Sequence, residues 1–263
     1  MAWDVKKDFD WGILGCGWLG TAWGLQCTSR ENRVWGSARR PEALASLEQV
    51  GIHPVPFSSD GDEAQALPEC QTILIALPPS AGAEAFQRAA KLAEACEWTV
   101  LISSTSVYPG DDGEYRESDA TRRISPHSGM CLLDLEHLFN PETTSILRAG
   151  GLFGPSRHPG QFLRGRPLAR PTDPVNMVHL TDVLRAIAHV SRTRLAGASN
   201  LVAPVLTSRE AFYTAAGAVT VNPPSPARAG GRRVLSDRIV ASGFSFQHPD
   251  PARVAADMSR SAE

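Results

Sequence analysis

The chain has 263 residues, of which 42% are hydrophobic, and its formal net charge at pH 7 is −2. A chain of this length buries a sizeable core and fits either one large domain or a main domain with an appendage. The balanced charge excludes the basic surface of a nucleic-acid-binding protein, and we find neither a run of about 18 apolar residues that would span a membrane nor a secretory leader. We therefore predict a cytoplasmic protein without nucleic-acid or membrane partners.

Cysteine and histidine spacing gives no sign of a disulfide framework or a metal site. The five cysteines are widely spaced without a C-x-x-C motif, and the seven histidines show no ligand spacing. The sequence predicts reduced cysteines and no bound metal.

A glycine triplet near the N-terminus organises the first half of the chain. The apolar stretch 11–14 predicts a strand, which runs into Gly15-x-Gly17-x-x-Gly20. In this context Gly15 turns the chain off the strand, Gly17 lets backbone N–H groups approach a pyrophosphate, and Gly20 lets helix and strand pack closely. The triplet predicts a dinucleotide site, and the alternative is a glycine-rich turn without a ligand.

The helix after the triplet supports the same prediction. It is expected to begin near Trp18 and to end around Thr28. The first N–H groups of a helix have no partner within it and carry the positive end of its dipole, so those near Trp18 and Leu19 would bind the same anion.

The residues after the second predicted strand, 34–36, favour NADP(H) over NAD(H) as the bound dinucleotide. An NAD site places a carboxylate about 20 residues beyond the glycines, where it binds the ribose hydroxyls. This chain has Ser37, Arg39 and Arg40 there instead. A hydroxyl and guanidinium groups would bind a 2′-phosphate through charge-assisted hydrogen bonds. We predict NADP(H) as cofactor, and the alternative is that both arginines form a solvated turn before the helix that Pro41 opens.

Strands and helices alternate along the chain up to residue 102. Helices are predicted over 18–28, 41–50 and 82–96, with a further helix that follows the acidic turn 58–63 and ends at Leu67. Strands are predicted over 11–14, 34–36, 53–57, 72–77 and 99–102. Such alternation with short connections is typical of the α/β class with a doubly wound parallel sheet, the Rossmann fold. Ala76, Leu77 and Pro78 end a strand at the same edge as the glycine loop, so we expect them along the bound dinucleotide.

The segment after the last of these strands, Ser103 to Gly110, reads Ser-Ser-Thr-Ser-Val-Tyr-Pro-Gly. It is similar to the SSxxVYG segment of the extended short-chain dehydrogenase/reductase superfamily, which includes sugar epimerases and dehydratases. The stretches 147–155, 176–183 and 232–246 resemble later motifs of the superfamily in the same order. The resemblance spans roughly residues 10 to 250, and four motifs in order make it specific to the superfamily.

This resemblance implies how the chain is divided. A dinucleotide-binding Rossmann domain is expected over 8–155 and a smaller substrate-binding subdomain over 156–263, with a strand and helix at about 175–192 returning to the Rossmann core. On the same pattern, further cofactor contacts are expected at Ser103, Gly151, Leu152 and Phe153, and substrate contacts at Met130, Arg157 and Asn176.

The catalytic tyrosine and lysine of the superfamily are absent. Gly129 and Glu136 align with the glycine and glutamate that flank this pair in its members. Ser128 then stands where the tyrosine belongs, and Leu132 stands where the lysine belongs. This departure, together with the tighter spacing of the glycines, resembles atypical members that are described as epimerase-like.

Three residues are candidates for the remaining chemistry. Ser104, four residues before Tyr108, matches the superfamily's catalytic Ser/Thr and would donate a hydrogen bond to the reacting oxygen. Alternatively, Ser104 only caps the loop. Tyr108 and His127 are the nearest proton donors, but an unperturbed tyrosine with a pKa of about 10 is a poor proton shuttle at neutral pH. His127 has a better matched pKa, and alternatively it is a surface histidine beside Pro126.

Together these features predict an NADP(H)-dependent oxidoreductase that acts on a small polar carbonyl or imine substrate. Two alternatives stay open: a non-catalytic NADP(H) sensor or scaffold, which the missing pair favours, and a nucleotide-sugar epimerase or dehydratase. A homodimer is a further hypothesis, with an apolar face of Leu132, Leu135, Leu138 and Phe139 on a helix over 128–139. Glu136, on the same helix, is expected in solvent or at a subunit contact.

The C-terminal part is predicted in outline. The polar loop 105–127 is interpreted as a lid or binding segment because of its length. Helices over 181–192 and 208–216 and a strand over 199–202 are expected to complete the small subdomain, and 223–231 is expected to be a connector.

Overall fold

The computed structural model describes residues 8–57, 67–125, 130–163, 166–218 and 231–260. The chain divides into two compact units. The first comprises Met1–Ser103, Arg122–Leu147 and Ile187–Gly197, and the second comprises Ser104–Thr121, Arg148–Ala186 and Ala198–Glu263. The boundaries between compact units need not coincide with those between functional domains, so the domain boundary after residue 155 stays a prediction.

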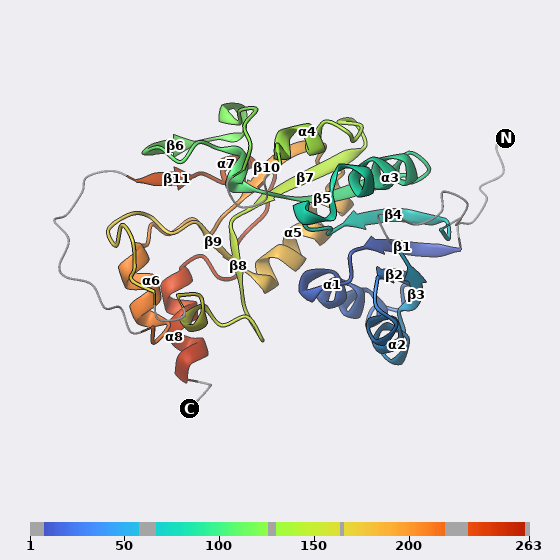
Figure 1. Cartoon of the computed structure of the whole chain (residues 1–263), viewed down its shortest axis with the longest axis horizontal. Helices are drawn as coiled ribbons and strands as arrows, with labels where there is room; N and C mark the ends of the chain where they lie inside the picture. The colour runs from blue at the N-terminus through green and yellow to red at the C-terminus, as the bar shows by residue number, and fades with distance from the viewer. Residues whose placement is uncertain (1–7, 58–66, 126–129, 164–165, 219–230, 261–263) are drawn as a thin grey trace. The chain divides into compact units, whose positions relative to one another are not determined.

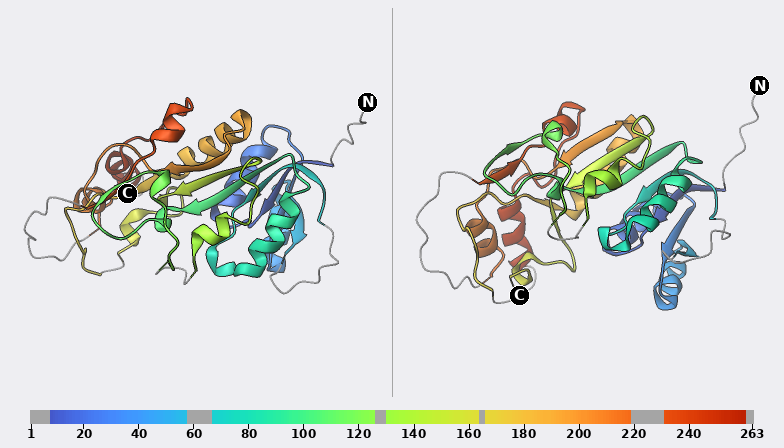
Figure 2. Two further views of the ribbon diagram at one scale, coloured as in Figure 1. Left: turned by 90° about the horizontal axis from the view of Figure 1, so that it is seen from above. Right: turned by 45° about the horizontal axis from the view of Figure 1, so that its top comes forward.

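A seven-stranded parallel sheet, in the order β10-β7-β5-β4-β1-β2-β3, is the centre of the fold (Figures 1 and 2). Its strands are β1 (Phe9–Leu14), β2 (Val34–Ala38), β3 (His53–Pro56), β4 (Cys70–Ile75), β5 (Trp98–Ser104), β7 (Thr144–Ala149) and β10 (Gly197–Leu201). Gly12 of β1 pairs in parallel with Trp35 of β2 and with Ile73 of β4. The predicted α/β class with a doubly wound parallel sheet is confirmed.

Helices of the first unit lie on both faces of its strands. The helices α1 (Trp18–Thr28) and α2 (Pro41–Gln49) cover one face, and α3 (Ala83–Ala93) covers the other (Figure 1). The strand order runs from β1 to β3 towards one edge of the sheet and from β4 to β10 towards the other. With right-handed crossovers, the helices of these two halves lie on opposite faces of the sheet. In such sheets a ligand binds where the order reverses, at the carboxyl ends of the strands. The acidic turn 58–63 and the helix predicted to end at Leu67 fall almost wholly outside the described residues.

The remaining elements are short, apart from the helices Leu180–Thr193 and Pro251–Arg260. They are η1 (Pro79–Ala81), η2 (Thr105–Val107), β6 (Gly113–Tyr115), η3 (Glu117–Asp119), α4 (Leu132–Glu136), β8 (Gly151–Phe153), η4 (Pro159–Gln161), β9 (Met177–His179), α5 (Leu180–Thr193), α6 (Arg209–Ala215), β11 (Arg232–Val234), α7 (Asp237–Ala241) and α8 (Pro251–Arg260). Within the described ranges, no helix is both long and apolar enough to cross a membrane.

Two strands pair differently from the prediction. The strand expected over 199–202 in the small subdomain is β10, which forms an edge of the main sheet beside β7. The strand expected near 175 is β9, which pairs with β8 in a separate two-stranded sheet where Gly151 lies opposite Met177. Strand propensity is local, whereas the choice of a neighbour depends on contacts between distant segments, so the sequence could not fix either pairing.

The helix expected over 128–139 is shortened to α4, and its apolar face is covered by the chain itself. Leu132, Leu135 and Phe139 are each at most 6% exposed, which leaves only Leu138 of the predicted dimer face on the surface. Glu136 is 3% exposed, so the expectation that it lies in solvent or at a subunit contact is wrong. These leucines therefore offer little to a partner, and the homodimer stays a hypothesis without them.

The second unit has an apolar core of its own. Phe153, at the end of β8, is 1% exposed and meets Phe212 of α6 edge-on, with ring centroids 5.4 Å apart. The same core includes Met177 of β9 and Val254 of α8. The core thus joins segments from across the C-terminal half of the sequence, and burial of this apolar area stabilises the unit.

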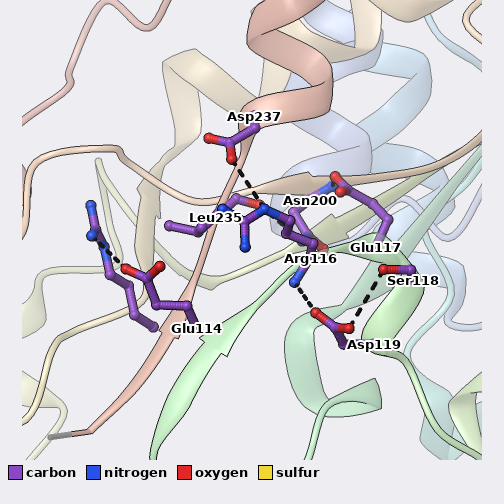
Figure 3. Close-up of polar contacts among 9 residues, drawn as sticks. Glu114, Arg116, Glu117, Ser118, Asp119, Asn200, Leu235 and Asp237 are labelled. Carbon is purple, nitrogen blue, oxygen red and sulfur yellow. Dashed lines mark hydrogen bonds and ion pairs between the residues drawn. The ribbon is translucent and has the colours of Figure 1, made fainter.

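Two asparagine side chains hold β11 in place. Asn176 donates from Nδ2 to the carbonyl of Arg232 and accepts at Oδ1 from the N–H of Val234, both at 2.8 Å. Asn200 donates to the carbonyl of Leu235 at 2.9 Å, and its own N–H donates to Glu117 at 2.8 Å (Figure 3). On the exposed side, Arg233 of β11 pairs with Glu114 of β6 (Figure 3). Asn176 is therefore a structural residue of this small sheet, which speaks against the predicted substrate contact through its side chain.

His179 gives the second unit a pH dependence. Its side chain is 8% exposed, Nδ1 accepts from the N–H of Thr181, and the ring of His248 lies 4.4 Å away. Burial, assisted by His248, lowers the pKa of His179 to about 4. In the unfolded chain His179 binds a proton near pH 6.5, whereas in the folded chain it stays neutral down to about pH 4. The contribution of His179 to the free energy of unfolding is therefore fully present above pH 6.5 and is lost as the pH falls towards 4.

We expect the free energy of unfolding to fall by up to about 3 kcal/mol between pH 6.5 and pH 4 on account of His179. Urea denaturation at a series of pH values measures the loss. His179→Gln should flatten this part of the profile, whereas His137→Gln, at an exposed position, should leave it unchanged. An unaltered profile in His179→Gln would contradict the assignment.

Candidate functional site

The glycine loop between β1 and α1 has the geometry that the sequence predicts. Gly15 has φ of +97°, and a Cβ there would lie 2.8 Å from the carbonyl oxygen of Ala76. A Cβ on Gly20 would lie 2.3 Å from the carbonyl oxygen of Gly15, so only glycine lets α1 pack this closely. Nothing lies within 4 Å of a Cβ placed on Gly17. The loop is therefore tight on the side of the sheet and open at Gly17.

Ser37 supports this loop from the end of β2. Its side chain is 1% exposed, and its Oγ accepts a hydrogen bond of 2.9 Å from the N–H of Gly15. The carbonyl of Ser37 also accepts from the N–H of Cys16 at 2.9 Å. The predicted contact of Ser37 with a 2′-phosphate stays a prediction, because this hydroxyl accepts from the loop and keeps its own proton for donation. Sequence reasoning missed this role because the bond joins residues 22 positions apart.

A cavity of about 620 Å³ opens at the loop, within the first unit. Gly15 and Gly17, Ser37 to Arg40, and Ala76 to Pro78 line it, together with Cys16, Ala43, Phe57, Ser80, Ala81 and Ala85. The structure therefore brings together predicted residues from the ends of β1, β2 and β4. The start of α1 at Trp18 and Leu19 borders the loop at Gly17, which is the N-cap of that helix.

Phe57 is a lining residue that the sequence analysis did not select. It follows β3 and is 6% exposed, and the guanidinium of Arg88 lies 4.9 Å from the centre of its ring. In a parallel sheet the carboxyl ends of all strands meet at one edge, which is the signal that could have identified it. An aromatic face in this position gives the cavity an apolar wall.

Positive charge is concentrated at one end of this cavity. Arg39 and Arg40 are exposed lining residues, and neither is paired with a carboxylate in the part of the chain that the structure describes. Among the described lining residues there is also no aspartate or glutamate. The cavity can therefore bind an anion at this end, and the helix start at Gly17 presents N–H groups to a second one.

Cys16 lies within the loop but is not a reactive group. Burial raises the pKa of its thiol to about 12, so the thiolate is scarce at neutral pH. The structure places its sulfur beside Gly36, where a Cβ would approach it to 2.5 Å. Cys16 therefore acts as an apolar packing residue.

Ser103, predicted to contact the cofactor, makes a hydrogen bond inside the first unit. Its hydroxyl donates to the buried carboxylate of Glu136 at 2.5 Å. A buried carboxylate needs such donors, because an unsatisfied charge is costly away from water. The bond joins the end of β5 to α4, and the hydroxyl of Ser103 is thereby occupied.

Ser104, the predicted hydrogen-bond donor to substrate, has the geometry of the capping alternative. Its Oγ accepts from the N–H of Ser106 and donates to the hydroxyl of Ser106, both at 3.1 Å. The residue is half-buried and caps η2. The hydroxyl of Ser104 can donate to a substrate only if its hydrogen bond to the Ser106 hydroxyl breaks.

Tyr108 belongs to a buried network of the second unit. It is 1% exposed, and its hydroxyl donates to Asn200 Oδ1 at 2.6 Å. Arg148, 4% exposed, donates to the Tyr108 hydroxyl at 3.1 Å and to the carbonyl of Glu117 at 2.9 Å. Burial raises the pKa of Tyr108 against the opposing effect of Arg148. This network gives Tyr108 a structural role, and the proton transfer predicted for it stays a prediction.

The remaining predicted residues are not gathered into the cavity at the glycine loop. His127 lies outside the described residues. Met130 is half-buried and accepts at its carbonyl from the N–H of Ser125, and Arg157 is exposed in a turn with Gly154. Gly151 and Leu152 belong to β8, whereas the Phe153 side chain is buried in the core of the second unit. The described residues include no cluster of three or more potential metal ligands.

Comparison with known proteins gives a relative and a fold. No protein-family model matches the chain. It is 30% identical to protein YeeZ of Escherichia coli strain K12 over 264 residues, which cover 91% of this chain and 96% of YeeZ.

Solved structures are similar to the chain over nearly its whole length. A human epimerase family protein in complex with NADPH has a TM-score of 0.73 at 18% identity, with 95% of this chain and 99% of that chain covered. The UDP-glucuronic acid 4-epimerase of Bacillus cereus, in complex with UDP-glucuronic acid and NAD, has a TM-score of 0.69 at 16% identity, with 97% and 100% covered. At these identities the similarity is one of fold.

Proposed function

This chain belongs to the family of Escherichia coli protein YeeZ and has an NAD(P)-binding, epimerase/dehydratase-like Rossmann fold, and from this premise we propose that it is an NADP(H)-dependent oxidoreductase for a small polar carbonyl or imine substrate. The observation that carries the proposal is the charge at the glycine-loop cavity. Arg39 and Arg40 lie there without a carboxylate among the described lining residues.

These arginines favour NADP(H) over NAD(H) on physical grounds. A 2′-phosphate adds up to two negative charges, and guanidinium groups bind phosphate oxygens through strong, charge-assisted hydrogen bonds. A carboxylate after β2 would select the free ribose hydroxyls instead. The Ser37 hydroxyl accepts from the glycine loop and can still donate to a phosphate, but it is uncharged, so discrimination rests mainly on the two arginines.

The residues of the chain have separate tasks in such a reaction. When bound, the nicotinamide supplies the transfer of a hydride to or from carbon. Gly17 and the start of α1 bind the pyrophosphate, and Phe57 and Ala76 provide apolar walls for the adenine half. Ser104 would orient the reacting oxygen by turning its hydroxyl away from Ser106.

A second function, a non-catalytic NADP(H) sensor, is favoured by a specific observation. Tyr108 is committed to a buried network, and Ser104 serves as a cap. With the tyrosine and lysine pair of the superfamily missing as well, the described part of the chain offers few groups for proton transfer. The same cofactor site would serve this function, without turnover.

Calorimetric titration with NADPH and NADH tests the cofactor part of the proposal. We expect NADPH to bind at least about 10-fold more tightly, because one charge-assisted hydrogen bond contributes about 1.5 kcal/mol or more. Equal affinities, or a preference for NADH, would contradict it. NADPH oxidation with a panel of aldehydes, ketones and imines then separates the functions, since tight binding without any turnover favours the sensor.

A further inference from the structure

Two cysteines of the first unit lie in contact. Cys70 begins β4 and is 3% exposed, and its sulfur lies 3.6 Å from the sulfur of Cys96. Cys96 is half-buried in the turn between α3 and β5. Since the two residues are 26 positions apart, the fold and not the local sequence brings them together.

Their surroundings hold the two sulfurs in this orientation. The thiol of Cys96 also lies 3.6 Å from the carbonyl of Leu92, to which it can donate, and either sulfur can be the donor in the contact between Cys70 and Cys96. Beneath Cys70 lies Gly12 of β1, where a Cβ would come within 2.7 Å of the Cys70 sulfur. Gly12 thus provides the space that Cys70 occupies, and the two sulfurs face each other with no side chain between them.

We propose that Cys70 and Cys96 are a redox modification site, at which a peroxide produces a reversible intramolecular disulfide. A disulfide has a sulfur–sulfur distance of about 2.0 Å, so the sulfurs must approach by roughly 1.6 Å from their present contact. Rotation of the Cys96 side chain can supply much of this movement, because that residue lies in a turn and not inside a strand.

The chemistry balances with peroxide as the oxidant. The more accessible thiolate, Cys96, attacks one peroxide oxygen to give a sulfenic acid and release hydroxide. The thiol of Cys70 then attacks the sulfenic sulfur, the sulfur–sulfur bond forms, and water leaves. In total two thiols and one hydrogen peroxide give one disulfide and two waters, and a dithiol reductant reverses the bond.

Two of the other three cysteines compete poorly for the oxidant. Burial raises the pKa of both Cys16 and Cys27 to about 12, which leaves little reactive thiolate at neutral pH. Cys131 is half-buried like Cys96, and therefore serves as the matched comparison.

Mass spectrometry of the peroxide-treated full-length protein tests the proposal. After alkylation of the remaining thiols and digestion without reductant, we expect a peptide pair joined through Cys70 and Cys96, lighter by two hydrogens than its separate peptides. Dithiothreitol should abolish the pair. Cys131→Ser should keep it at the wild-type yield, and Cys96→Ser should lose it while circular dichroism shows a folded chain.

Three results would overturn the proposal. One is recovery of both cysteines in alkylated form at peroxide doses that oxidise Cys131. Another is a disulfide of Cys96 with Cys131 or with a second chain, seen on non-reducing gels. The third is conversion of Cys96 to the sulfinic acid without passing through the joined peptides.

Discussion

Replacing Arg39 and Arg40 together with alanine is expected to weaken NADPH binding by about 100-fold or more, with NADH binding changed less than about threefold. Both residues line the glycine-loop cavity, and neither is paired with a carboxylate among the described residues. Their loss therefore removes phosphate contacts without breaking an ion pair of the fold. Calorimetric titration of the double variant with each dinucleotide measures the effect.

A matched arginine makes this prediction specific. Arg30 is exposed beyond the end of α1 and does not line the cavity, so Arg30→Ala should bind NADPH as the wild type does. If Arg30→Ala and the double variant lose affinity equally, only general charge is involved. If neither loses affinity, the arginines do not bind the dinucleotide, and the preference for NADP(H) has no basis.

Replacing Arg148 with alanine is expected to lower the free energy of unfolding by about 3–5 kcal/mol. This buried side chain donates to the Tyr108 hydroxyl and to the carbonyl of Glu117, and its guanidinium lies 5.7 Å from the Tyr108 ring centre. The variant leaves a cavity and two acceptors that have lost a donor. Urea denaturation followed by circular dichroism gives the loss, and a change below about 1 kcal/mol would contradict the buried network.

Tyr108→Phe separates the structural role from the catalytic one. It should cost about 1–3 kcal/mol, because Asn200 loses a donor and Arg148 an acceptor in a buried site. Tyr115→Phe is the matched control, since its hydroxyl donates to the carbonyl of Asp111 at 3.2 Å in an exposed position. It should change stability by less than about 0.5 kcal/mol. If Tyr108→Phe abolished turnover at unchanged stability, Tyr108 would be catalytic after all.

The sequence predicted the geometry of the glycine loop better than the surroundings of the candidate catalytic residues, for a physical reason. The glycine loop and the pair Arg39 and Arg40 follow directly from strand–turn–helix order, because backbone turns and strand ends are determined by neighbouring residues. Gly15, Gly20 and Ala76 accordingly lie where the prediction put them. The fold class follows from the same local alternation.

The surroundings of the candidate catalytic residues depend on long-range partners, which no local pattern specifies. Tyr108 reads as a proton donor in isolation, yet its hydroxyl is bound by Arg148 and Asn200, which lie 40 and 92 positions away. The hydroxyl of Ser103 is likewise taken by Glu136, 33 positions on. Buried polar groups find partners wherever the fold provides them, so residue type alone could not tell an exposed functional group from a satisfied internal one.

The side chain of Asn176 has a consequence for how the chain avoids self-association. It occupies the carbonyl of Arg232 and the N–H of Val234, the alternating pair through which an incoming strand from a second molecule would lengthen a sheet. Exposed strand edges are common starting points of aggregation. One amide thus satisfies both groups on its flank of β11, and Asn176→Ala would leave this carbonyl and N–H without their side-chain partner.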